Sequence, residues 1–136
     1  MTHAEHNYNV CNFLAQSDVD ANDWIVTTAF YSVLHYCENS LFPADYYVDS
    51  NAKEINHYSS FEDFVQSFRN SFPNRRNASP HKVRRWLIEN QVDEISFEYC
   101  ALADNCFMAR YNNYRISEEG KEEAIRFLNF IKEYCD

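Results

Sequence analysis

The sequence predicts an all-α fold, a four- to five-helix up-and-down bundle formed as a single domain over residues 1–136. Apolar residues recur at steps of three and four along most of the chain, and no segment sustains the period-two alternation of a half-buried strand. One Gly and three Pro leave few of the tight turns that a sandwich or barrel needs. Because 46% of its residues are apolar, a chain of this length can bury its own core.

Two helices and a loop are predicted in the first half of the chain. Residues 4–16 fit a helix, and residues 17–22 form a polar turn. A longer helix is predicted from Asp23 to Phe42, where Pro43 ends it because the proline ring does not fit a helix interior. Residues 43–60 are polar and rich in Tyr, which indicates a long loop. The residues expected to face inward are Val10, Phe13 and Leu14, and then Val26, Phe30, Val33, Cys37 and Leu41.

The second half contains four helical segments. A short helix is predicted over residues 60–72 and a loop over 73–78. Ser79-Pro80 starts the next helix, which runs to Asn90, because Ser is a favoured N-cap residue and Pro suits the first helical position. A further helix spans 93–113, and Ser117 opens the last one. The expected inward residues are Phe61, Phe64, Val65, Phe68, Val83, Trp86, Leu87, Ile95, Tyr99, Leu102, Cys106, Ala109, Ala124, Leu128, Ile131 and Cys135.

Positive charge is concentrated in segment 69–85. The chain has a net charge of −9, but this segment holds six Lys and Arg and no acid, so it carries +6 and the remaining residues −15. Free N–H groups at the Ser79 helix start attract anions, and Arg side chains suit phosphate oxygens. The alternative is a solvated loop whose Arg residues pair with this protein's many carboxylates. The candidate anion- or RNA-binding residues are Arg75, Arg76, Ser79, His81, Lys82, Arg84 and Arg85.

A second candidate site lies at the end of the 93–113 helix. Arg110 is predicted to share a face with Phe107, Asn113 and Tyr114, next to the chain reversal before the last helix. This arrangement suits a small polar site where the last two helices meet. It equally suits a local cap in which Arg stacks on an aromatic ring.

Several other classes of protein are excluded or disfavoured. No apolar run approaches the ~20 residues that a membrane span requires, and the N-terminus does not resemble a signal peptide. Five Cys without a CxxC pair suggest reduced thiols in a cytoplasmic protein. Asp18-Val-Asp20 begins like a calcium loop, but Asp23 and Ala29 occupy the positions of the required Gly and Glu. We therefore expect no metal and no cofactor.

Three segments together resemble the HEPN superfamily, small all-α domains of prokaryotic toxin and defence systems that also occur fused to nucleotidyltransferases. The first combines Asp23-Trp24 with Thr28-Ala-Phe-Tyr-Ser-Val-Leu-His-Tyr36. The second is Ser79-Pro-His-Lys-Val-Arg-Arg85, and the third runs from Leu102 to Tyr114. The resemblance implies a four- or five-helix bundle that forms a homodimer. The aromatic content and the face of the second helix with Trp24 and Tyr31 also favour a dimer.

In the ribonuclease branch of that family, an Arg is followed four to six residues later by a His. The Arg that corresponds here is Arg110, but no His follows it and Arg115 stands near that place. Tyr114 is a poor substitute base, since its unperturbed pKa is about 10. Arg76 and His81 have the right spacing but precede a different helix. Arg110, Tyr114, His81 and Arg76 are therefore the candidate catalytic residues.

The expected function is an RNA-associated or regulatory role without strong catalysis, in antiviral defence, stress or a toxin–antitoxin system. One alternative is a metal-independent endoribonuclease. The other is a protein-interaction subunit that partners a nucleotidyltransferase.

Overall fold

The chain forms six α-helices and one small hairpin in a computed structural model, which describes residues 1–18, 20–111 and 115–136. The helices are α1 (His3–Gln16), α2 (Asn22–Ser40), α3 (Phe61–Ser71), α4 (Pro80–Gln91), α5 (Asp93–Tyr111) and α6 (Glu118–Cys135). The predicted all-α class is thus confirmed in its main feature, the dominance of helices. The six helices correspond to the six segments predicted one by one along the chain, so the count of four to five given for the bundle as a whole is not confirmed.

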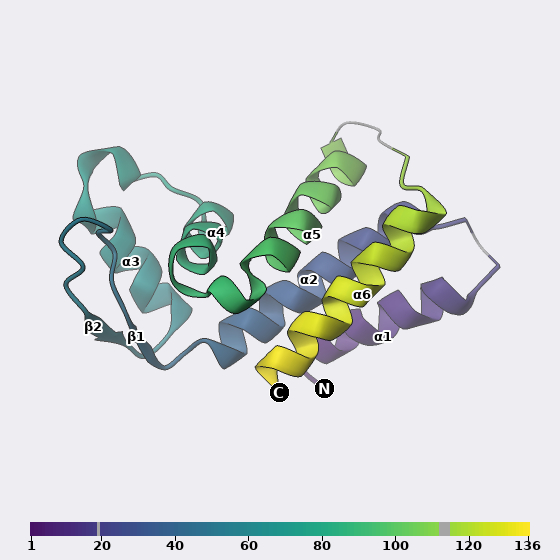
Figure 1. The fold of residues 1–136 in the computed structure, drawn as a ribbon, viewed down its shortest axis with the longest axis horizontal. Helices are drawn as coiled ribbons and strands as arrows, with labels where there is room; N and C mark the ends of the chain where they lie inside the picture. The colour runs from purple at the N-terminus through teal and green to yellow at the C-terminus, as the bar shows by residue number, and fades with distance from the viewer. Residues whose placement is uncertain (19, 112–114) are drawn as a thin grey trace.

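Helix α2 is the centre of the helical layer and packs against α1, α5 and α6 (Figure 1). The α2 residues predicted to face inward are all buried, and so are those of α3. Figure 1 shows α3 and the hairpin at the end of the molecule away from α1, with α4 between α3 and α5. This position of α4 lets its first turn face both α2 and α5.

The start of α4 forms as predicted. Ser79 has an extended backbone, and its hydroxyl accepts a hydrogen bond from the backbone N–H of Lys82 at 3.2 Å. Pro80 occupies the first helical position, where its missing N–H costs nothing. Val83, Arg84, Leu87 and Ile88 form the buried side of the helix. His81 and Lys82 consequently lie on its exposed side.

Two segments differ from the prediction. Residues 43–60, expected as a loop, contain strands β1 (Ala44–Tyr46) and β2 (Asn56–Tyr58), which pair antiparallel. Strands of three residues are too short to show a periodic pattern, but the rings of Tyr46 and Tyr58 are buried and anchor the hairpin. Residues 73–78 begin with a 3₁₀ turn, η1 (Pro73–Arg75), rather than an irregular loop.

The inward face predicted for α1 is wrong at Phe13, whereas Leu14 packs against the core as expected. Phe13 is 73% exposed, whereas Ala4 and Cys11 are fully buried. Ala4 allows a close approach to α2, where its carbonyl oxygen accepts a hydrogen bond from the Ser32 hydroxyl at 2.8 Å. The contact of α1 therefore combines two fully buried small residues with the partly buried side chains of Tyr8 and Leu14, which also pack against the core. None of the helices in the described ranges is long and apolar enough to cross a membrane.

Candidate functional site

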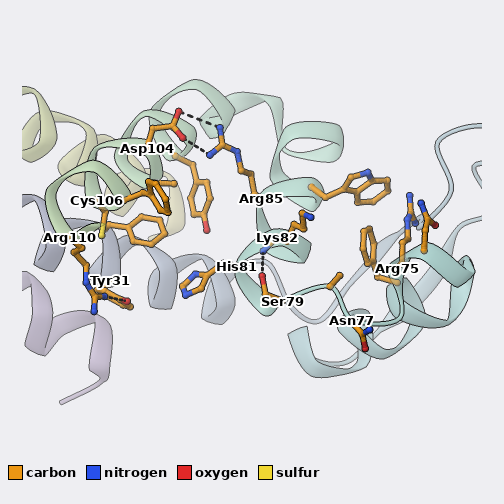
Figure 2. A pocket seen from close by; sticks show the side chains of 18 residues that line it. Tyr31, Arg75, Asn77, Ser79, His81, Lys82, Arg85, Asp104, Cys106 and Arg110 are labelled. Carbon is orange, nitrogen blue, oxygen red and sulfur yellow. Dashed lines mark hydrogen bonds and ion pairs between the residues drawn. The ribbon is translucent and has the colours of Figure 1, made fainter. Parts of the chain in front are cut away.

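An open cleft of about 1080 Å³ lies where α4 meets α2, α5 and the η1 segment. Figure 2 shows Tyr31 and Arg110 at one end, Arg75 and Asn77 at the other, and His81 between them. Cationic and aromatic side chains line most of its length. The lining residues are Phe30, Tyr31, Phe68, Asn74, Arg75, Asn77, Ala78, Ser79, His81, Lys82, Arg85, Trp86, Tyr99, Ala103, Asp104, Cys106, Phe107 and Arg110.

Arg110, Tyr31 and His81 form a cluster at one end of the cleft. Nη1 of Arg110 donates to the Tyr31 hydroxyl oxygen at 2.5 Å, and the guanidinium carbon lies 5.7 Å from the centre of the Tyr31 ring. The ring of His81 meets the same Tyr31 ring edge-on, with 6.4 Å between centroids. Residues from three helices thus converge, and the two sequence candidates Arg110 and His81 share one site.

The surroundings of His81 favour the neutral form of its imidazole. Partial burial lowers its pKa below the ordinary value, and the positive charges of Arg84 and Arg110 lower it further, while Glu38 opposes them. Its ring also lies 6.1 Å from the Phe30 ring. Since the ordinary pKa of His is about 6.5, His81 is predominantly neutral at pH 7.

Among the described residues, Lys82 is the cation of α4 that faces the cleft and has no carboxylate partner. The ion pairs that involve α4 in the described part of the chain belong to Arg84 and Arg85. The Ser79 cap and the first turn of α4 lie directly beside it. An anion in this part of the cleft would therefore meet the ammonium group of Lys82 and the positive end of the helix dipole.

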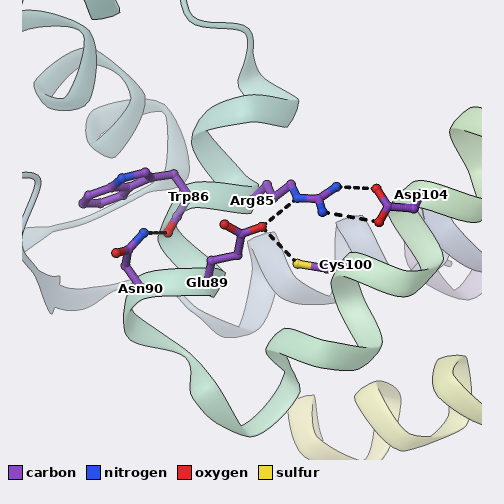
Figure 3. A network of polar contacts seen from close by, with 6 residues as sticks. All are labelled: Arg85, Trp86, Glu89, Asn90, Cys100 and Asp104. Carbon is purple, nitrogen blue, oxygen red and sulfur yellow. Dashed lines mark hydrogen bonds and ion pairs between the residues drawn. The ribbon is translucent and has the colours of Figure 1, made fainter.

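Arg84 and Arg85 were both candidates for anion binding, and each is paired with carboxylates. Arg84 is only 4% exposed, lies outside the cleft lining and forms an ion pair with Glu38. Arg85 lines the cleft, but its guanidinium pairs with Glu89 at 2.7 Å and with Asp104 at 2.7 Å (Figure 3). These two carboxylates raise the pKa of Arg85.

The other end of the cleft is built around Arg75. Its guanidinium carbon lies 4.1 Å from the centre of the Phe68 ring and 5.0 Å from that of Trp86. It also donates to the backbone oxygen of Val48 and to the Ser71 hydroxyl. Arg75 therefore stacks on aromatic rings and ties the loop after β1 to α3, with burial lowering its pKa.

The remaining candidates are placed differently. Ser79 lines the cleft, whereas Arg76 is exposed and is not among the lining residues, so Arg76 and His81 do not share the cleft. Tyr114 lies outside the described residues. Tyr31 and Asp104 were not among the candidate site residues. The sequence signals for Tyr31 were the face of α2 that it shares with Trp24 and its place in the segment 28–36 that resembles the HEPN superfamily.

No family model, curated protein or solved structure matches this chain.

Proposed function

We propose that the cleft binds single-stranded RNA and that the protein is an RNA-associated regulatory component with weak or no catalysis of its own. The observation that carries this proposal is the convergence of Lys82, His81 and Arg110 along an aromatic-walled cleft. Cations attract the phosphate backbone, and exposed aromatic faces stack on unpaired bases. The acidic remainder of the chain disfavours non-specific coating of nucleic acid and leaves the cleft as the favoured site.

The cellular setting of this proposal follows from the resemblance to the HEPN superfamily. We extend the proposal to a homodimer that acts in prokaryotic defence, stress or a toxin–antitoxin system. A cognate partner, such as a nucleotidyltransferase, is part of the same extension. Exposed aromatic side chains outside the cleft, among them Trp24 and Phe97, are candidates for such protein contacts.

Metal-independent endoribonuclease activity is the second candidate function. The proximity of His81 and Arg110 around Tyr31 favours it, since Arg can hold a scissile phosphate and His is the usual group for proton transfer near pH 7. The reaction would need a base to take the proton of a 2′-hydroxyl as its oxygen attacks the adjacent phosphorus. The cluster offers His81 as the side chain for that step.

Binding is tested with a fluorescently labelled single-stranded oligoribonucleotide and anisotropy. We expect Lys82→Ala to weaken binding about tenfold and to reduce the dependence of affinity on salt concentration. Arg126→Ala is the matched control, because Arg126 is an exposed cation on α6 that does not line the cleft. Equal affinities for wild type and Lys82→Ala would contradict the proposal.

Catalysis is tested by incubating the same RNA with wild type, Arg110→Ala and His81→Ala under chelation of metal ions. We expect little cleavage by wild type. Robust wild-type cleavage that is lost in both variants would establish the ribonuclease function in place of the binding function.

A further inference from the structure

An ion pair between a buried guanidinium and a partly buried carboxylate lies directly behind the cleft residue His81. Arg84 pairs with Glu38 of α2, and its guanidinium carbon stacks over the Phe61 ring at 4.8 Å from the ring centre. Nη1 of the same guanidinium lies 3.3 Å from Nδ1 of His81. Arg84 thus connects the core of the protein to the cleft.

The contact between Arg84 and His81 fixes the position of the imidazole proton. A guanidinium only donates hydrogen bonds and remains protonated in proteins. Nδ1 of His81 must therefore accept, which leaves the single proton of the neutral ring on Nε2. Protonation at Nδ1 would place two donors face to face and add a positive charge beside Arg84 and Arg110.

We propose that Arg84 is a positioning residue that holds His81 as the neutral Nε2–H tautomer, so that His81 offers a hydrogen-bond donor to the RNA in the cleft. This inference rests on the proposed function. The Nδ1 edge of the ring faces Arg84, so the Nε2 edge is the one available to a ligand. A phosphate oxygen or a base carbonyl is the acceptor that fits a neutral N–H group.

The same tautomer explains why the cleft binds RNA without cleaving it. A general base needs an unprotonated nitrogen directed at the proton that it removes. In His81 the unprotonated nitrogen is Nδ1, and it is occupied by Arg84. His81 therefore donates a hydrogen bond to the ligand and does not accept a proton from it.

Stability alone does not account for the Arg84–Glu38 pair. Burying the Arg84 guanidinium and partly burying the Glu38 carboxylate costs desolvation energy, and well-packed apolar residues in place of a buried ion pair are often neutral or stabilising. A role in orienting His81 is a physical reason for placing a guanidinium here. Besides Arg84, the charged groups that act on His81 are Glu38 from α2 and Arg110 from α5, the Tyr31 ring lies against it, and Lys82 follows it on α4.

The proposal is tested by NMR of the histidine side chains with long-range ¹H–¹⁵N correlation at pH 7.5, with His81→Gln used for assignment. We expect wild-type His81 to show an unprotonated Nδ1 and a protonated Nε2. In Glu38→Leu/Arg84→Met, which removes both charges together so that the core stays filled, the two tautomers should become mixed. A matched control, Glu123→Leu/Arg126→Met, removes an ion pair from α6 and should leave the wild-type pattern unchanged.

An Nδ1–H tautomer in wild type, or an unchanged Nε2–H pattern in Glu38→Leu/Arg84→Met, would overturn the proposal. The RNA affinity of that double variant should fall by about threefold to tenfold, as expected for a misdirected hydrogen bond. Unchanged RNA affinity with mixed tautomers would also overturn the role of His81 as the donor. Failure of wild type to bind any RNA would instead refute the proposed function, while the tautomer measurement would stand by itself.

Discussion

On the buried side of α4, Arg84 is enclosed and paired with Glu38, whereas on the open side Lys82 faces the cleft with no carboxylate partner among the described residues. Arg85 is intermediate, because it lines the cleft but is paired with Glu89 and Asp104. Three cations within four residues therefore have three different surroundings. A cluster of Lys and Arg in a sequence therefore does not show how many of their charges are available to a ligand.

The largest expected effect on stability comes from removing Glu38 alone from its ion pair with Arg84. Glu38→Ala leaves the Arg84 guanidinium buried without its counter-charge, and removing one partner of such a pair costs about 3–5 kcal/mol. We expect the free energy of unfolding, measured with urea, to fall by an amount in this range. Lys82→Ala, on the open side of the same helix, should change it by less than about 0.5 kcal/mol. Similar losses in the two variants would remove the distinction between the two sides.

The second prediction concerns Arg110 of α5, the cation at the end of the cleft beside Tyr31. Arg110→Ala should weaken RNA binding about tenfold, because a charge-assisted contact to phosphate contributes roughly 1.5–3 kcal/mol. Binding is measured by anisotropy at two salt concentrations. Arg110→Lys keeps the charge but loses the planar contact with Tyr31, so it should recover only part of the affinity. Full affinity in Arg110→Ala would show that this end of the cleft does not contact the ligand.

Local signals in the sequence were sufficient for the helices and for the start of α4. The Ser79-Pro80 cap and the apolar spacing act within a few residues, so they could be read without the fold. The burial of Arg84 was also open to prediction, since it precedes the buried Leu87 and Ile88 by three and four residues. Because Arg84 is an Arg in a basic segment, the sequence instead suggested that it binds an anion.

The shared site of His81 and Arg110 could not be predicted from local patterns. The two residues lie far apart in the sequence, on α4 and α5, and meet only because both helices pack beside Tyr31 of α2. The same limit applied to Asp104 and to the hairpin of residues 43–60. Each depends on tertiary contacts that no periodicity reveals.

The third prediction tests whether Asp104, by pairing with Arg85, reduces the positive charge available in the cleft. Asp104→Asn removes a negative charge from the cleft and releases one end of the Arg85 guanidinium. We expect RNA affinity to increase about threefold at low salt, and the gain to shrink as salt screens the charges. Glu89→Gln serves as the control, because Glu89 also pairs with Arg85 but does not line the cleft. Weaker binding by Asp104→Asn would indicate that Asp104 itself contacts the ligand.

The smallest expected effect concerns the two histidines beside the Arg84–Glu38 pair. Burial lowers the pKa of both His35 and His81 below their ordinary value. Between that lowered value and the unfolded value near ~6.5, the unfolded chain binds more protons, so stability is complete above about pH 6.5 and is lost as the pH falls below it. Both rings are partly exposed, so water screens the effect and keeps it small.

This pH effect is measured by urea unfolding of wild type and His35→Gln/His81→Gln at pH 7.5 and pH 5.5. Carboxylates contribute equally to both proteins, so the difference between them isolates the two histidines. We expect the free energy of unfolding of the double variant to fall less between the two pH values than that of wild type. An equal or larger fall would mean that one of these histidines gains a proton more readily in the folded protein. Such a result would contradict the lowered pKa values of this pair of histidines, and the single variant His81→Gln would then show whether His81 is the one that gains the proton.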